Sequence, residues 1–329
     1  MLSLLRYRRL PYNFLIGGLF EEGIMDTSYL PKAKINLMPT FYFKNKSNKL
    51  EPMVDSTFIL RRLEKLYSDR SAVPKSSVLN FLNYLIEDFA DEWLTKATFH
   101  YRWTYDEDIK KAGSTLSRWR SLTDNEETIK PIRKDISERQ ISRLYVVGSN
   151  TTTSDIIEGS YKNILKLMDK HMNNYPYIFG ERPSSSDFAL YGQLTQLAAF
   201  DPTPMKIADN IASRIVAWVG VMEDLSGLEV NNSDWVNSNN LTESFRNIFY
   251  EIGNTYVPVL KANSEAVYQN KEEVKIEING KLWTQKPFYY QSKCLNWIKE
   301  EYEALENKDK NFIDDFLNGT GCEQLFNEK

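Results

Sequence analysis

The segment Gly180-Glu181-Arg182-Pro183-Ser184-Ser185-Ser186-Asp187-Phe188-Ala189-Leu190-Tyr191 is the stretch on which the interpretation of the fold depends most. Ser184 and Asp187 stand three residues apart where an apolar run begins. In a capping box, the hydroxyl of such a serine accepts a hydrogen bond from the backbone N–H of Asp187, and the Asp187 carboxylate accepts one from the N–H of Ser184. The spacing therefore predicts a helix over residues 185–200 that begins at this box.

Helical patterns lie on both sides of this segment. Upstream, Leu79, Leu82, Phe89 and Trp93 form an amphipathic stripe that predicts one long helix over residues 76–105. A polar stretch over residues 113–125 predicts an interruption. The other helices that the apolar spacing predicts cover residues 132–147, 156–174, 207–225 and 241–270.

The last part of the chain contains a hairpin signal. Asn279-Gly280 stands between two alternating runs within residues 274–284, and this dipeptide favours a tight turn between antiparallel strands. Two further helices are predicted over residues 289–305 and 310–317. A two-stranded hairpin is marginal in water without packing partners, so we expect this region to pack on the preceding helices. The aromatic residues expected to be buried there are Trp283, Phe288, Tyr289, Tyr290 and Trp297.

The first part of the chain mixes helix and strand signals. A helix is predicted over residues 2–9, a short strand over 12–16, and a β-branched and aromatic strand over 35–43. A second short strand over 50–54 contains Pro52, which argues for a sheet edge. A helix follows Asp55-Ser56.

Composition excludes several classes of protein. The 329 residues are 42% hydrophobic and 26% charged, values typical of globular domains rather than disordered or collagen-like chains. A formal net charge of −4, from 41 basic and 45 acidic side chains, gives no global field that would attract nucleic acid or an anionic membrane. We therefore expect no nucleic-acid or membrane partner. Aromatic residues reach 13%, which is enough for a large core.

Cysteine content and the N-terminal pattern predict a cytoplasmic protein. Only Cys294 and Cys322 occur, and neither has a Cys or His neighbour at metal-binding spacing, so we expect neither a disulfide framework nor a metal. Cys294 is expected in the core, and Cys322 as a small packed side chain near a helix cap. The first nine residues place their basic residues after the apolar ones, the reverse of a signal peptide, and no run reaches about 18 apolar residues.

Three features together resemble the cytosolic glutathione S-transferase superfamily: Met38-Pro39-Thr40-Phe41 at the start of a strand, Asp55-Ser56 at the start of a helix, and the capping box at residues 184–187. The resemblance covers about residues 1–228. It implies a thioredoxin-like α/β domain over residues 1–70, incomplete at its N-terminus, and a helical domain of the transferase type over 76–228. Residues 241–329 would form a helix–hairpin–helix extension. The fold class is thus expected to be α+β and mostly helical.

The resemblance also implies a site for glutathione as cosubstrate. Met38 would pair its backbone with the cysteinyl part of glutathione, and Pro39 would be cis. Ser56, at a helix N-terminus, would bind the γ-glutamyl carboxylate, while Asp55 would bind the ammonium. From the residues alone, Asp-Ser before an apolar run is first of all a helix cap.

The sequence departs from this family at its N-terminus. Family members open with a central strand, and the catalytic Tyr, Ser or Cys follows it. Here Met1 already lies in the first helix, so the catalytic residue is unknown and would be expected upstream of Met1. Tyr7 and Tyr12 are poor substitutes, because they would fall at the end of the helix and in the next strand. We expect either an incomplete reading of a longer chain or a fold variant without catalysis.

The helix over residues 76–105 offers a second place for chemistry. Lys96, His100 and Trp103 could share one face, in the part that resembles the family's second-substrate pocket. His100 is a weak candidate for an acid or base, and a buried hydrogen-bonded histidine is the favoured alternative. His171, in a polar helix end, is expected at the surface.

The sequence therefore supports two functional hypotheses. The first is a glutathione S-transferase-like protein that conjugates the glutathione thiol to an unknown electrophile. The second is a non-catalytic interaction or scaffold protein that keeps the fold as a docking surface. A homodimer remains open in both cases.

Overall fold

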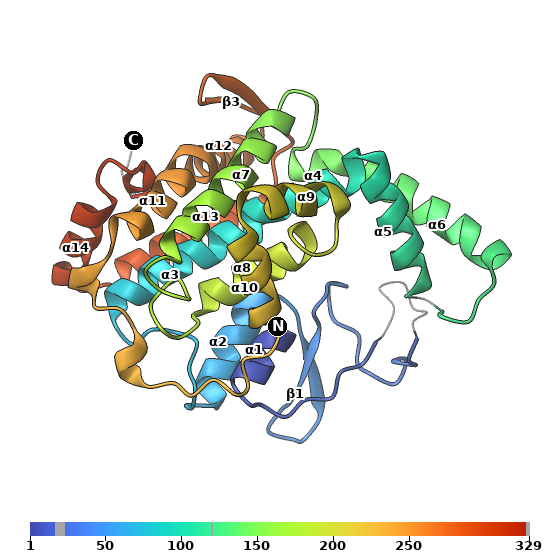
Figure 1. Cartoon of the computed structure of the whole chain (residues 1–329), viewed down its shortest axis with the longest axis horizontal. Coiled ribbons are helices and arrows are strands. Elements are labelled where there is room, and N and C mark those ends of the chain that lie inside the picture. The colour runs from blue at the N-terminus through green and yellow to red at the C-terminus, as the bar shows by residue number, and fades with distance from the viewer. Residues whose placement is uncertain (17–23, 120, 327–329) are drawn as a thin grey trace.

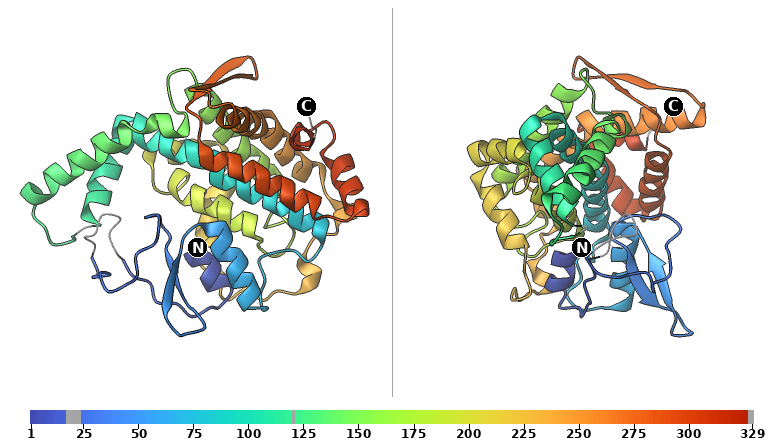
Figure 2. Two further views of the ribbon diagram at one scale, coloured as in Figure 1. Left: turned by 180° about the vertical axis from the view of Figure 1, so that it is seen from behind. Right: turned by 90° about the vertical axis from the view of Figure 1, so that its right-hand side faces the viewer.

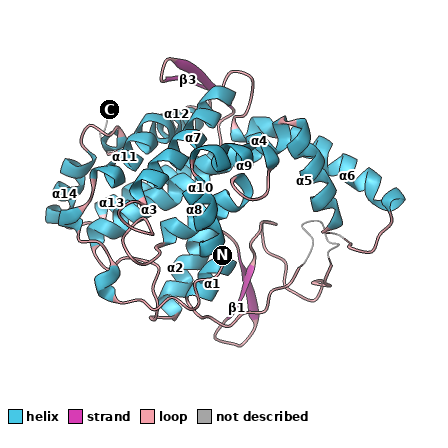
Figure 3. Cartoon of the chain, in the orientation of Figure 1, coloured by secondary structure: helices cyan, strands magenta, loops and turns pink. Residues whose placement is uncertain are grey.

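A computed structural model of the chain describes residues 1–16, 24–119 and 121–326. Helices dominate these residues, and the strands form two separate antiparallel pairs (Figures 1 and 3). The fold class is α+β and mostly helical, as the sequence predicts. Within the same ranges, no helix is both long and apolar enough to cross a lipid bilayer.

The N-terminal part carries the first strand pair. Its elements are α1 (Leu2–Tyr7), β1 (Phe41–Lys44), β2 (Leu50–Met53) and α2 (Ser56–Leu66). β1 and β2 pair antiparallel, with Phe41 opposite Met53 and Tyr42 opposite Pro52. Each strand has only the other as its neighbour in the described residues, so Pro52 stands on an edge strand as expected.

The short strand predicted over residues 12–16 is not formed. Tyr12, Phe14 and Leu15 are exposed there, and no described strand lies beside them to accept and donate backbone hydrogen bonds. The strand predicted over 35–43 is also shorter than expected, because a turn precedes it. In that turn the Thr40 hydroxyl donates to the Leu37 carbonyl at 2.7 Å, and strand geometry begins only at Phe41.

One long helical run forms the spine of the molecule. It consists of α3 (Ser77–Phe89), the π-helical turn η1 (Ala90–Leu94) and α4 (Thr95–Thr104), which confirms the helix predicted over 76–105. The helices α7 (Ser154–His171) and α8 (Ser185–Leu197) pack against this run. The reciprocal bonds of the capping box at Ser184 and Asp187 are both present at the start of α8, as predicted.

Helices α5 (Asp106–Arg118) and α6 (Glu126–Ile141) form an antiparallel arm that projects from the body (Figures 1 and 2). The interruption predicted over residues 113–125 begins later than expected, because α5 continues through Gly113 to Arg118, and it ends at Asn125, the N-cap of α6. A Cβ at Gly113 would lie 2.6 Å from Ser137 Oγ, so the glycine permits close approach of α6 rather than ending α5. The helix predicted over 132–147 begins earlier and becomes the 3₁₀ turn η2 (Leu144–Val147) at its end.

The helix predicted over 207–225 is two helices, α9 (Pro202–Ile211) and α10 (Ser213–Met222). Ala212 separates them with φ −156° and ψ 55°, a conformation outside the helical region. The chain then passes through two 3₁₀ turns, η3 (Asn232–Asp234) and η4 (Ser238–Asn240), toward the C-terminal part.

The C-terminal part covers one side of α3. Its elements are α11 (Glu243–Glu251), η5 (Ile252–Tyr256), α12 (Val257–Tyr268), β3 (Val274–Ile278), β4 (Lys281–Gln285), α13 (Tyr289–Glu303), α14 (Asn307–Leu317) and η6 (Cys322–Leu325). The predicted hairpin is confirmed, with Asn279 and Gly280 both at positive φ in its turn. Figure 2 shows α13 lying alongside α3.

A single hydrophobic cluster joins these parts. It extends from Leu4 in α1 to Leu325 in η6, so the C-terminal part shares the core of the central helices. Trp283 is fully buried and packs 5.1 Å from Trp93, ring centroid to ring centroid, as expected. The burial predicted for Phe288 and Tyr289 is wrong, because both side chains are exposed at the start of α13. Tyr290 and Trp297 are partly buried.

Candidate functional site

The four residues expected to bind glutathione gather at one end of the β1–β2 hairpin. The Met38–Pro39 peptide bond is cis, as expected. β1 begins two residues after Pro39 and β2 ends two residues before Asp55, so both segments adjoin the open end of the hairpin. Met38 is 57% exposed, and in the described part of the chain no group bonds its backbone.

Asp55 and Ser56 form the N-terminus of α2. Asp55 is the N-cap, with φ 79°, and its Oδ1 accepts a hydrogen bond from the backbone N–H of Thr57 at 3.1 Å. The Ser56 hydroxyl donates to Asp91 Oδ2 at 3.4 Å. Asp55 Oδ2 accepts a hydrogen bond from the hydroxyl of Tyr290 on α13. The helix-cap interpretation of Asp55 is thus confirmed, and the backbone N–H groups of this end favour an anion.

Acidic side chains of the spine gather beside this helix end, and the sequence analysis missed them. Burial and the neighbouring carboxylate of Glu92 raise the pKa of Asp88 to about 8. Burial, together with Glu87, Glu92, Asp88 and Asp55, raises the pKa of Asp91 well above its usual range. We call Asp55, Glu87, Asp88, Asp91 and Glu92 the acidic corner.

The acidic corner could have been found from its spacing. Asp88, Asp91 and Glu92 stand at i, i+3 and i+4 within an otherwise apolar stripe, and such positions share a helix face. Cationic groups also lie near these carboxyl groups: Arg61 is 3.1 Å from Glu87, Lys96 interacts with Glu92, and the N-terminal ammonium of Met1 interacts with Asp91. The raised pKa values of Asp88 and Asp91 favour protonated carboxyl groups in this corner, and a further cation beside them would favour their ionised forms.

Neither tyrosine near the N-terminus lies at this site. Tyr7 is fully buried, and its hydroxyl accepts a hydrogen bond from Arg182 Nη2 at 3.1 Å. Burial raises the pKa of Tyr7, which keeps the phenol neutral. Tyr12 is exposed in the segment that forms no strand. Tyr7 is therefore a poor candidate for stabilising a thiolate, whereas the strand position expected for Tyr12 is wrong, and the catalytic residue stays unassigned.

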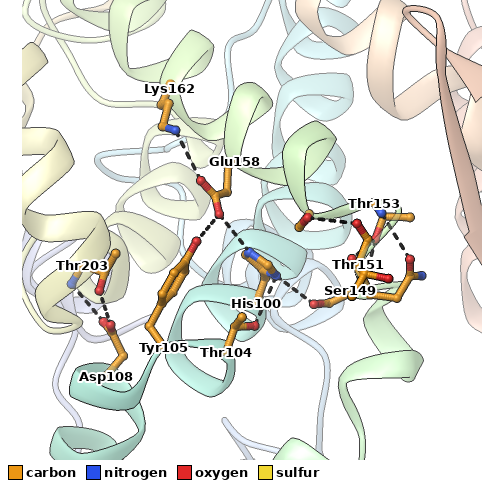
Figure 4. A network of polar contacts seen from close by, with 12 residues as sticks. His100, Thr104, Tyr105, Asp108, Ser149, Thr151, Thr153, Glu158, Lys162 and Thr203 are labelled. Atoms are coloured by element: carbon orange, nitrogen blue, oxygen red, sulfur yellow. Dashed lines mark hydrogen bonds and ion pairs between the residues drawn. The ribbon is translucent and has the colours of Figure 1, made fainter.

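His100 lies at the centre of a buried polar network (Figure 4). Its Nδ1 is 2.8 Å from Ser149 Oγ and its Nε2 is 3.4 Å from Glu158 Oε1, while the Tyr105 hydroxyl donates to the same Glu158 oxygen. Burial lowers the pKa of His100, so the imidazole is neutral at pH 7.

The order Ser149, His100, Glu158 is that of a nucleophile, a base and an orienting acid. However, His100 is 2% exposed and Ser149 5% exposed, which leaves no approach for a substrate. The network instead connects α4 with the segment after η2, through Ser149, and with α7, through Glu158. The buried, hydrogen-bonded interpretation of His100 is confirmed.

Lys96 and Trp103, expected with His100 in a substrate pocket, are also buried. The Lys96 ammonium donates to the Val147 carbonyl and to Gln285 Oε1, each at 3.3 Å, and lies over the Trp283 ring. Burial lowers its pKa to about 8. The side chains of Lys96, His100 and Trp103 therefore face the interior rather than solvent. Gln285 of β4, in the C-terminal part, covers Lys96.

The remaining candidate nucleophiles and bases are also internal. Cys294 and Cys322 are buried, and burial raises the pKa of both thiols, so neither is a thiolate at neutral pH. The core placement predicted for Cys294 is confirmed. The surface placement predicted for His171 is wrong: His171 is buried, with Nε2 3.1 Å from the Ile178 carbonyl oxygen.

Hollows on the described surface include two that lie away from these residues. One, of about 320 Å³, lies between α11 and α14 and is lined by Thr242, Arg246 and Phe316. The other, of about 490 Å³, lies beside Leu79 and Trp235. Neither includes a residue of the acidic corner or of the predicted glutathione site.

No family model, no curated protein and no solved structure matches this chain. The function is therefore argued from the residues and the geometry above.

Proposed function

We propose that the protein binds glutathione at the N-terminal end of α2 and is a glutathione S-transferase-like protein. The observation that carries the proposal is the β1–β2 hairpin, whose open end adjoins the Met38-Pro39 turn on one strand and Asp55-Ser56 on the other. A backbone that makes no hydrogen bond to any described residue, a helix N-terminus and a carboxylate are thus found next to the same end of the hairpin. These are the groups that a γ-glutamyl peptide needs.

Each part of glutathione has a matching group in this proposal. The cysteinyl backbone pairs, as an added strand would, with the backbone of Met38, which makes no hydrogen bond to any described residue. The γ-glutamyl carboxylate binds the N–H groups and hydroxyl at Ser56, where the helix dipole favours an anion. The ammonium binds the Asp55 carboxylate through a charge-assisted hydrogen bond.

The reaction in this proposal is attack of the glutathione sulfur on an electrophile. A carbon–sulfur bond forms, the leaving group departs with its electron pair, and the thiol proton passes to solvent. The described residues place no hydroxyl or thiol where it would stabilise the sulfur anion. Met38, Asp55 and Ser56 bind the ground state and the transition state alike, so they do not raise the turnover rate. We therefore expect binding with little turnover.

Calorimetry with glutathione and a conjugation assay with a chlorinated nitroaromatic compound test this proposal. Asp55→Asn is expected to weaken glutathione binding about tenfold or more, because the ammonium loses its charged partner. Ser76→Ala is the matched control, since Ser76 caps α3 through the N–H of Leu79 and lies on another helix. That variant should lose stability and keep its affinity for glutathione. Rapid turnover that His100→Ala abolished would contradict this proposal.

A second function, a non-catalytic interaction protein, is favoured by a separate observation. Large apolar side chains are exposed at high density within residues 12–16 and 24–38, and contiguous exposed apolar surface marks interaction sites. They are Tyr12, Phe14, Leu15, Ile24, Met25, Tyr29, Ile35, Leu37 and Met38. If glutathione does not bind and sedimentation shows self-association that Phe14→Ser and Ile35→Ser reduce, this second function replaces the first.

A further inference from the structure

Tyr290, in the C-terminal part, reaches the proposed glutathione site from far along the sequence. Its hydroxyl donates to Asp55 Oδ2, and the two residues are 235 positions apart. The Asp55 carboxylate thus receives one hydrogen bond on each oxygen, from Thr57 N–H on Oδ1 and from Tyr290 on Oδ2. A carboxylate has about four lone-pair sites, so each oxygen keeps one for a further donor.

The start of α13 is held firmly enough to fix Tyr290. The Asn263 side chain accepts a hydrogen bond from Phe288 N–H at 2.7 Å and donates to the Phe288 carbonyl at 2.9 Å. Gln291, the residue after Tyr290, donates a hydrogen bond from its side chain to the Glu92 carbonyl at 3.1 Å. These bonds attach the residues on both sides of Tyr290 to α12 and to η1.

An aromatic contact holds the ring of Tyr290 itself. Trp297 lies 5.8 Å from the Tyr290 ring and 5.0 Å from the ring of Phe58, which belongs to α2. Trp297 therefore connects α13 with the helix whose N-terminus carries Asp55. The hydroxyl of Tyr290 is presented to Asp55 by packing on both sides.

The same corner contains a buried acceptor without a partner. Gln291 is 2% exposed, and its Oε1 receives no hydrogen bond from any described residue. An unpaired acceptor in the interior costs free energy that a donor would recover. The amide nitrogen of Gln291 donates to the Glu92 carbonyl, so this unpaired acceptor belongs to a residue that contacts the acidic corner.

We infer that Tyr290 is a positioning residue of the ligand site, which orients the Asp55 carboxylate toward the ammonium group of a γ-glutamyl compound. This inference rests on the proposed function. It makes the C-terminal part a contributor to the site, and it limits the ligand to compounds that carry a free ammonium beside the γ-glutamyl carboxylate. Tyr290 acts through Asp55 and need not touch the ligand.

The test compares two ligands on the full chain by calorimetry: glutathione, and a glutathione analogue in which hydrogen replaces the γ-glutamyl amino group. Tyr290→Phe removes only the hydroxyl. We expect it to weaken glutathione binding about 5- to 20-fold, because the Asp55 carboxylate loses its orientation. The affinity for the analogue should be the same in both proteins, since it has no ammonium for Asp55 to bind.

Tyr302→Phe is the matched control, because Tyr302 also lies on α13 and donates to Asp314 at 2.7 Å, on the side of α14. This variant should bind glutathione as the unaltered chain does. If the unaltered chain binds glutathione and Tyr290→Phe leaves that affinity unchanged, or weakens both ligands equally, the role of Tyr290 is refuted while the proposed function stands. If the unaltered chain does not bind glutathione, both are refuted.

Discussion

Asp187 organises the start of α8 through both of its oxygens. Oδ2 accepts hydrogen bonds from the Ser184 N–H at 2.8 Å and the Ser184 hydroxyl at 2.7 Å, and Oδ1 accepts one from the Ile178 N–H at 2.9 Å. The residue is fully buried, and burial raises its pKa to about 6. One side chain thus joins a helix cap to the preceding loop.

We expect Asp187→Ala to lower the free energy of unfolding by about 1–3 kcal/mol, because it leaves two backbone N–H groups unpaired in the interior. Urea denaturation would measure the change. Asn125→Ala is a suitable comparison, since Asn125 caps α6 at an exposed position and its loss should cost about 1 kcal/mol or less. Equal effects of the two substitutions would argue against the buried role of Asp187.

The raised pKa of Asp88 predicts how the free energy of unfolding depends on pH. Its pKa is about 8 in the folded protein and about 3.9 in an unfolded chain. Between these values the folded state holds a proton that the unfolded chain has released, so this group makes the free energy of unfolding fall as pH rises from about 4 to about 8. Asp88 Oδ2 also accepts a hydrogen bond from the Tyr256 hydroxyl at 2.5 Å, which an asparagine oxygen can accept as well.

Asp88→Asn should therefore raise the melting temperature at about pH 8.5 and leave it nearly unchanged at about pH 3.5, below the pKa of Asp88 in both states. Thermal melts across this range would measure the difference. Asp315→Asn, at an exposed position of α14, is the control and should shift neither value. A variant that melted below the unaltered chain at the higher pH would show that the ionised carboxylate stabilises the fold.

At the scale of elements, close backbone approach decides where η5 can lie. A Cβ at Gly253 would stand 2.2 Å from the Thr320 carbonyl oxygen and 2.7 Å from the Cys322 nitrogen. Both are backbone atoms of the segment that leads into η6, so neither can move aside without shifting the chain. The contact fixes the C-terminal end of the chain on the helical run of α11, η5 and α12.

Gly253→Ala should destabilise the protein by about 1–3 kcal/mol through this overlap. Gly159→Ala is the matched substitution, because a Cβ there meets no atom within 4 Å and α7 gains helix propensity. It should be neutral or stabilising by up to about 1 kcal/mol. Denaturant midpoints of both variants would test the difference, and similar destabilisation by both would refute the contact as its cause.

At the scale of the whole molecule, the C-terminal part belongs to the core. Its fully buried residues include Ile248, Phe249, Leu260, Trp283 and Ile298, all in the cluster that contains the central helices. Removing these residues would expose the apolar face of α3 and α7 to water. The free energy lost would exceed the marginal stability of an ordinary domain.

A chain that ends after Gly227 should therefore lose cooperative unfolding, bind a hydrophobic dye and aggregate. Near-ultraviolet circular dichroism and dye fluorescence of residues 1–227 would measure this. A second shortened chain that ends after Leu317 is the comparison, because it keeps α11 to α14 and should retain a cooperative transition at lower temperature. A stable, soluble 1–227 fragment would refute the shared core.

Local interactions explain what the sequence by itself determined. The capping box at Ser184, the turn at Asn279-Gly280 and the amphipathic stripe of residues 76–105 all depend on neighbours within a few positions, and each was formed as predicted. The helix start at Asp55-Ser56 belongs to the same group. Chirality, capping and periodicity act within a segment, so its residues are enough to reveal them.

Contacts between distant segments decided which side chains are buried and which predicted strands form. His171 is internal because the Ile178 loop folds over it, and residues 12–16 form no strand because no neighbouring strand completes their hydrogen bonds. The candidate site shows the same division. The sequence predicted a helix start at Asp55 and Ser56, whereas the hydrogen bond from Tyr290 to Asp55 joins residues 235 positions apart. Burial and long-range pairing depend on which segments the whole chain brings together, and only the tertiary structure defines that.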